Sequence, residues 1–130
     1  MTIANWCVVA AAVLPILTVG MAKASSRGSR KNGGYDNNNP RQWEEKLQGW
    51  KQRAVAAQNN GFEALPLFAA AVLMAQQAHA DQSRIDQLAL GFIVVRLVYV
   101  ALYLKDLATL RSLVWAIGLG ISITLVAMAA

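Results

Sequence analysis

Charged residues are scarce in this sequence, and residues that form disulfides or bind metals are scarcer still. Only 15% of the residues are charged, against roughly 25% in soluble domains. Cys7 is the only cysteine, which excludes an intrachain disulfide, and we interpret it as a small apolar residue of a helix. His79 is the only histidine, and no metal-ligand spacing surrounds it, so we expect no metal site.

Apolar residues make up 56% of the chain and come in blocks long enough to cross a membrane. The sequence predicts an all-α integral membrane protein with a single domain over 1–130. We expect a four-helix bundle with helices at about 3–22, 54–80, 88–104 and 112–130. The first block is interpreted as a retained helix and not as a cleaved signal peptide, because no basic residue precedes it and Lys23 follows it.

A polar loop rich in Gly, Ser and Asn is expected at about 23–49, between the first two apolar blocks. A short helix should begin near Arg41, because Asn39 is a suitable N-cap and Pro40 suits the first helical position. No stop signal follows, so the sequence predicts that this helix continues into the second apolar block.

The basic residues predict the orientation in the membrane. Most of them fall in the first loop, at the start of the second long helix, or in the link after the third: Lys23, Arg27, Arg30, Lys31, Arg41, Lys46, Lys51, Arg53, Lys105 and Arg111. Lys and Arg are retained on the cytoplasmic side, so both termini should face outward. The net charge of +5 is therefore attributed to topology and to contact with membrane lipid, and we expect no nucleic-acid partner.

Three ionisable residues are predicted to lie within or at the edge of the membrane: Arg53, Glu63 and Arg96. Such groups are costly unless they are paired or face a cavity, which makes each a functional candidate. Counted along their helices at about 1.5 Å per residue, Glu63 and Arg96 lie at similar depths. A buried Glu63–Arg96 ion pair is the simplest expectation, and it could also be purely structural.

More polar side chains converge at this depth than one ion pair needs. Arg96, Tyr99 and Tyr103 follow one another at i, i+3 and i+7, so they share one helix face. Arg53, Asn60 and Glu63 share a face of the preceding helix, with Gln58 at its border. Such a pocket suits a small, hydrophilic, anionic ligand. The candidate binding residues are Arg53, Gln58, Asn60, Glu63, Arg96, Tyr99 and Tyr103.

These residues resemble the motifs of the MAPEG superfamily, the membrane-associated proteins of eicosanoid and glutathione metabolism. The stretch RAVAAQNNGFEALPLF is similar to the family's pattern of Arg, Gln-x-Asn, Glu and Pro-Leu-Phe. The stretch RLVYVALY is similar to the Arg-x-x-Tyr-x-x-x-Tyr of the leukotriene C synthase branch. The resemblance covers essentially the whole chain, including its length and its long first loop.

The resemblance implies a homotrimer in a bacterial inner membrane, with glutathione as cofactor between neighbouring subunits. Gln58, Asn60 and Glu63 would hold its peptide and amino groups. The implied activity is that of a glutathione transferase or peroxidase. Its substrate would be a lipophilic small molecule that arrives through the bilayer between subunits.

The resemblance also assigns the catalytic residues, although the sequence departs from the family at two positions. Arg111 would activate the thiol, with Tyr103 as a hydrogen-bond donor. The family's arginine in the second helix falls here on Ala56, for which Arg53 is the substitute one turn earlier. The thiol-activating arginine falls on Leu110, one residue before Arg111.

Two other classes of function are compatible with the same features. One is a non-catalytic scaffold or accessory subunit of a larger membrane complex, which would keep the fold and the charged pair without binding a thiol. The other is a small channel or transporter, which four helices with buried charges would permit. Neither internal repeats nor broken helices are present to favour the transporter.

Overall fold

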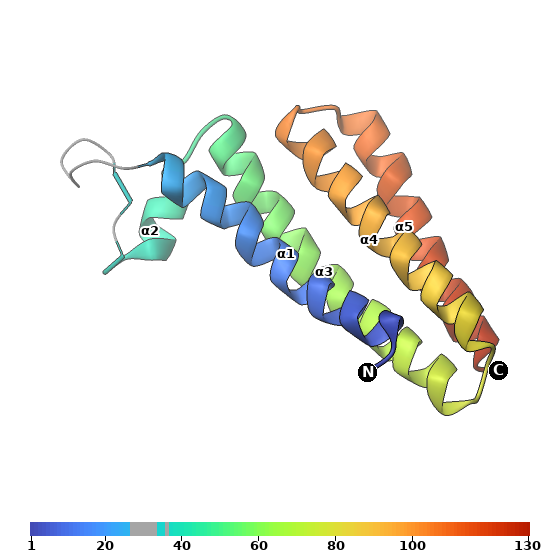
Figure 1. The fold of residues 1–130 in the computed structure, drawn as a ribbon. Coiled ribbons are helices and arrows are strands. Elements are labelled where there is room, and N and C mark those ends of the chain that lie inside the picture. The colour runs from blue at the N-terminus through green and yellow to red at the C-terminus, as the bar shows by residue number, and fades with distance from the viewer. Residues whose placement is uncertain (27–33, 36) are drawn as a thin grey trace.

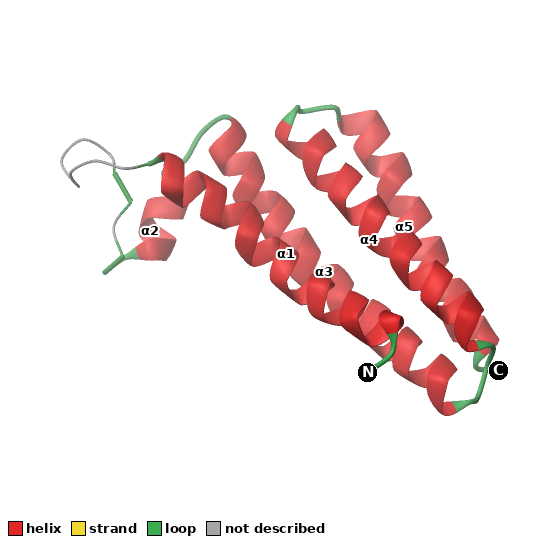
Figure 2. Ribbon diagram, in the orientation of Figure 1, coloured by secondary structure: helices red, strands yellow, loops and turns green. Residues whose placement is uncertain are grey.

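The computed structural model describes residues 1–26, 34–35 and 37–130. Over these residues the chain is helical, with no strand (Figures 1 and 2). This confirms the all-α prediction. The helices are α1 (Ile3–Ser25), α2 (Pro40–Glu45), α3 (Trp50–Gln77), α4 (Gln82–Leu104) and α5 (Ala108–Met128). The expected basic residues Arg27, Arg30 and Lys31 of the first loop lie outside the described residues.

Three of the long helices, α1, α4 and α5, are long and apolar enough to cross a membrane, with mean hydropathies of 2.0, 2.0 and 1.8 in their most apolar stretches. The 28-residue α3 is longer, but its first half carries the polar residues discussed above. It packs against each of the other three long helices, while α1 and α5 lie on opposite sides of α3 and α4. Since α4 also packs against all three, the polar residues of α3 belong to one of the two central helices, which suits a protein embedded in lipid.

Several helix boundaries differ from the sequence-based expectation; α3 spans Trp50–Gln77 instead of 54–80, and α5 begins at Ala108 instead of 112. The polar segment before the third apolar block is helical, and α4 therefore begins at Gln82. Asp81 caps this helix, because its side chain accepts a hydrogen bond from the Ser83 backbone N–H (3.2 Å). The expected continuation of the short helix into α3 is wrong. That helix, α2, ends at Glu45. Gly49 prevents a continuous helix, because its φ is 68°, a value that glycine adopts without strain.

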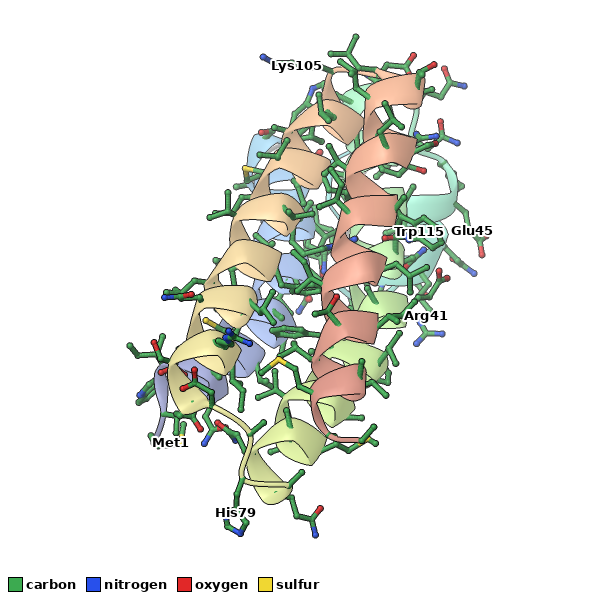
Figure 3. All side chains as sticks on the ribbon, turned by 90° about the vertical axis from the view of Figure 1, so that its right-hand side faces the viewer. Met1, Arg41, Glu45, His79, Lys105 and Trp115 are labelled. Carbon is green, nitrogen blue, oxygen red and sulfur yellow. The ribbon has the colours of Figure 1, made fainter. Side chains whose placement is uncertain are left out.

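Both chain termini lie at one end of the molecule, and the α4–α5 link lies at the other (Figure 1). Figure 3 shows the same polarity, with Met1 and His79 near one end and Lys105 at the opposite end. At the terminal end, the Asp86 carboxylate accepts hydrogen bonds from the Ala4 backbone N–H (3.0 Å) and from Gln82 Nε2 (2.8 Å). The bond from Ala4 attaches the start of α1 to α4, and the bond from Gln82 lies within α4.

The apolar core lies in the half of the molecule that is nearer the termini. Phe68 of α3 and Phe92 of α4 are buried and stacked, with ring centroids 3.8 Å apart and planes inclined by 7°. Small residues of α1 pack against this core, among them Cys7, which is only 5% exposed. The rings fill the core while the small side chains of α1 let that helix come close.

The approach of α1 to α3 at Pro15 depends on a glycine. A Cβ atom added at Gly61 would lie 2.7 Å from Pro15 Cγ, whereas one added at Gly120 of α5 would meet nothing within 4 Å. We therefore expect Gly61→Ala to lower the free energy of unfolding by about 1–3 kcal/mol. Gly120→Ala is the matched control and should be neutral or stabilising. Thermal unfolding in detergent measures both, and equal stability of the two variants would contradict this packing.

Candidate functional site

Two tyrosines of α4 lie in a row between two arginines, one from α4 and one from α5. The guanidinium carbon of Arg96 lies 4.2 Å from the ring centroid of Tyr99, and the Tyr99 and Tyr103 rings meet edge to face at 5.7 Å. The guanidinium carbon of Arg111, from α5, lies 4.2 Å from the ring centroid of Tyr103. Each cation is held by the π-face of a tyrosine. We call these four residues the Arg–Tyr ladder.

Arg111 joins the ladder because of where α5 begins. The helix starts at Ala108, which places Arg111 in its first turn, next to the end of α4. Leu110, one residue earlier, is 51% exposed and does not line the polar cavity. The one-residue difference from the family motif therefore does not remove a cation from this position.

Arg96 is buried, being 5% exposed, and its partner is not the one expected from the sequence. Its Nη1 donates a hydrogen bond to the Asn60 side-chain oxygen at 3.0 Å. Among the described residues Glu63 forms no ion pair with Arg96, so the predicted buried pair is wrong. A neutral amide satisfies a guanidinium donor without taking a second charge out of water, which avoids the larger desolvation cost of a buried ion pair.

Two adjacent cavities open between α3 and α5, along α4. The polar cavity has a volume of about 190 Å³ and is lined by Asn60, Tyr99, Tyr103, Arg111, Ser112 and Trp115. The apolar cavity has a volume of about 210 Å³, and its lining includes Asn60, Glu63, Leu67, Phe92, Arg96 and Trp115. Asn60 and Trp115 line both cavities, so the two spaces meet at these residues.

Arg53 lies outside both cavities. Its Nε and Nη2 donate hydrogen bonds to the Leu104 backbone carbonyl at 3.2 and 3.1 Å. This carbonyl belongs to the last residue of α4, where helix carbonyls lack partners within the helix. The structure thus uses Arg53 to cap α4 and to join it to α3.

Gln58 also lies apart from the Arg–Tyr ladder. It lines a separate cavity of about 590 Å³ between α2 and α3, together with Lys23, Arg41, Glu44 and others. Its side-chain oxygen is buried and has no hydrogen-bond partner among the described residues. Gln58 and Asn60 are two residues apart on a helix, so their side chains differ in direction by about 160°. One subunit therefore does not bring Gln58 and the ladder together.

Trp115 and Ser112 are lining residues that sequence reasoning missed. Both belong to α5. The sequence of this helix was interpreted only as an apolar membrane span, so neither residue was predicted to line a site. Arg111 and Trp115 are four residues apart, so they share a helix face, and this spacing was a signal in the sequence. Figure 3 shows Trp115 part-way along α5, between the Lys105 end and the His79 end.

Comparison with known proteins identifies one family. The family model described as MAPEG family matches residues 3–130, which is essentially the whole chain. No curated protein and no solved structure gave a match.

Proposed function

Because the chain belongs to the MAPEG family, we propose that it is a glutathione-binding membrane protein that acts as a glutathione transferase or peroxidase on lipophilic electrophiles. Family membership and three apolar helices establish an integral membrane protein. The observation that carries the proposal is the pair of adjoining cavities, in which Arg111 and Glu63 present opposite charges about Asn60.

The charges of these cavities complement those of glutathione. At neutral pH the tripeptide carries two carboxylates and one ammonium group. Arg111 offers a cation to one anionic group of the tripeptide, and the Asn60 amide is placed to contact the peptide. Glu63 is exposed on the surface of an apolar bundle and has no cationic partner among the described residues. An ionised carboxylate in that position needs a cation or a covering subunit, and the ammonium group supplies the cation.

The position of Gln58 supports a site that is shared between subunits. In one subunit Gln58 lines the cavity beside α2 and lines neither the polar nor the apolar cavity. In a homotrimer, the Gln58 face of one subunit can cover the polar and apolar cavities of the next. We further propose that α3 spans the membrane with the other long helices. The basic end would lie in the cytoplasm and both termini outside a bacterial inner membrane, as the opposed ends of the molecule allow (Figure 1).

The proposed chemistry needs a cation close to the thiol. Bound glutathione would supply a thiol nucleophile that is reactive only as the thiolate. Arg111, fixed over the Tyr103 ring, would favour the negative form of that sulfur. The Tyr103 hydroxyl would donate a hydrogen bond to it. Asn60, held by Arg96, would orient the peptide, and Phe92 and Leu67 would keep water from the reacting pair.

A mixed-subunit experiment tests the shared site. Gln58→Leu and Glu63→Gln should each weaken glutathione binding by about tenfold or more when expressed alone. Co-expression should restore about a quarter of the sites, because each restored site takes Glu63 from one subunit and Gln58 from its neighbour. Calorimetry on the purified mixture counts these sites.

The control for this experiment is a mixture of wild type with a subunit that carries both substitutions. Random assembly of that mixture should also leave about a quarter of the sites intact. No recovery in the first mixture would place the whole site within one subunit and contradict the shared site. Binding without any conjugation or peroxidase activity would instead support the non-catalytic scaffold.

A further inference from the structure

Arg53 does not lie where a glutathione ligand is expected, since it lines neither the polar nor the apolar cavity. Its side chain holds a backbone atom of another helix instead. Nε and Nη2 of Arg53 both donate hydrogen bonds to the Leu104 carbonyl oxygen, at 3.2 and 3.1 Å. Hydrogen bonds from a charged donor are roughly twice as strong as those between neutral groups. Arg53 therefore fixes the backbone at the end of α4 relative to α3.

The carbonyl that Arg53 holds is next to the residues proposed to activate the thiol. Leu104 follows Tyr103 directly in the chain, so a shift of this carbonyl also shifts the Tyr103 backbone. The centroid of the Tyr103 ring in turn lies 4.2 Å from the guanidinium carbon of Arg111. The end of α4 thus sets where Tyr103 and its cation stand in the polar cavity.

The link between α4 and α5 carries the same constraint to Arg111 through the backbone. The Asp106 N–H donates to the Tyr103 carbonyl at 3.1 Å, and the Leu107 N–H donates to the Leu102 carbonyl at 3.0 Å. Asp106 has a φ of 60°, the left-handed conformation with which helices commonly end. The Leu107 carbonyl then accepts a hydrogen bond from the Arg111 N–H at 3.0 Å. This short link leaves Arg111 little freedom to move independently of α4.

We propose that Arg53 is a positioning residue for Arg111, the proposed thiol-activating cation, and that it acts by holding the Leu104 carbonyl instead of contacting glutathione. This inference rests on the proposed glutathione function. It replaces the role of direct ligand, in which Arg53 would substitute for the family arginine that is Ala56 here. A misplacement of about 1 Å that originates far from the chemistry can cost about 10²-fold in rate. The loss of Arg53 should therefore slow the chemical step and leave glutathione binding nearly unchanged.

Arg53→Met separates positioning from binding. With chlorodinitrobenzene as the electrophile, kcat of the detergent-purified protein should fall by about 10–10²-fold, while calorimetry should find the glutathione Kd within about twofold of wild type. The apparent thiol pKa of bound glutathione, followed by thiolate absorbance in the ultraviolet, should rise, because Arg111 is no longer fixed. Arg53→Lys keeps a charged donor for the same carbonyl and should recover part of both losses. Arg53→Gln, which keeps a neutral donor, replaces Arg53→Met in every comparison if Arg53→Met fails to fold.

Lys105→Met is the matched control for the loss of a positive charge. Lys105 is exposed beside Leu104, at the same end of α4, and it takes no part in the two hydrogen bonds. Its replacement should leave kcat and the thiol pKa unchanged. Equal losses in Lys105→Met and Arg53→Met would show that charge alone matters and would overturn the positioning role.

A double-variant cycle tests whether Arg53 acts through Arg111. Arg53→Met should lower kcat by no more than about twofold further in an Arg111→Ala background, whereas independent effects would multiply. The inference is overturned if the effect of Arg53→Met is undiminished in that background, or if Arg53→Met alone keeps wild-type kcat and thiol pKa. It is also overturned, with the proposed function left standing, if the glutathione Kd rises by about tenfold or more in Arg53→Met and returns when Ala56→Arg is added. Folded wild-type protein that binds no glutathione would overturn both.

Discussion

Replacing Arg111 with alanine should lower kcat for glutathione-dependent conjugation by about 10²–10³-fold, the loss typical when one group that stabilises a developing or bound anion is removed. The reason is local. Arg111 is the ladder cation that lines the polar cavity, and its guanidinium is fixed 4.2 Å from the Tyr103 ring. Without it, the sulfur would keep its ordinary thiol pKa and remain mostly protonated at neutral pH. Steady-state kinetics across pH measure the loss and the rise of the apparent thiol pKa.

The fold should tolerate this change. Arg111 lies in the first turn of α5, and among the described residues it forms no ion pair. Leu110→Ala is the matched control, because the neighbouring side chain is 51% exposed and does not line the polar cavity. Tyr103→Phe keeps the ring beneath Arg111 and tests the hydroxyl alone. An Arg111→Ala variant with wild-type kcat would show that another group activates the thiol.

Replacing Asn60 with leucine should lower the free energy of unfolding by about 1.5–3 kcal/mol, as expected when a charged donor loses its acceptor. Arg96 is 5% exposed, and its Nη1 would then lack the oxygen that it bonds at 3.0 Å. Arg96→Met should cost less, because it also removes the buried charge and its desolvation penalty. The double variant should recover part of the loss. Denaturant unfolding in detergent gives the coupling energy of the pair.

Glu63→Gln is the control for this cycle. The sequence-based ion pair would make this change as damaging as the loss of Arg96, since it would leave a buried charge without its counter-charge. The structure instead leaves Glu63 exposed at the apolar cavity, so its neutralisation should change stability little. A Glu63→Gln variant that unfolds as readily as Asn60→Leu would contradict the observed pairing.

The sequence predicted those features that depend on local spacing. The spacing of Arg96, Tyr99 and Tyr103 requires only helical geometry to put the three on one face, and the structure confirms this. The short helix beginning at Pro40 was predicted in the same way, because N-capping and proline preferences act within a few residues. The all-α architecture followed from apolar blocks that are longer than strands require.

Features that depend on how two helices are staggered could not be predicted in this way. Similar depth along α3 and α4 suggested Glu63 as the partner of Arg96, but a helix turn earlier Asn60 occupies that place. Arg53 shares a face with Asn60 by helical periodicity. In the structure, a backbone carbonyl at the end of α4 lies close enough to accept two hydrogen bonds from Arg53. Both outcomes depend on distances between helices, which periodicity within one helix does not contain.

The surroundings of Gln58 could not be predicted from the sequence either. Its sequence neighbours placed it at the border of the expected pocket, whereas the structure turns it toward α2 and leaves its oxygen unpaired among the described residues. The sequence could not show this position of Gln58. The contact of α2 with α3 depends on the turn between the two helices, where Gly49 has a positive φ. The proposed site between two subunits would reconcile the motif with this geometry.

Calorimetric titration of the detergent-purified protein with glutathione tests the central claim most directly. The account predicts one binding site per subunit. It also predicts that Glu63→Gln weakens binding by about tenfold or more, the equivalent of one charge-assisted contact. N-acetylated glutathione, which lacks the ammonium group, should bind wild type weakly and should be insensitive to Glu63→Gln. Folded wild-type protein that gives no binding heat with glutathione, at concentrations well above those in cells, would contradict the account.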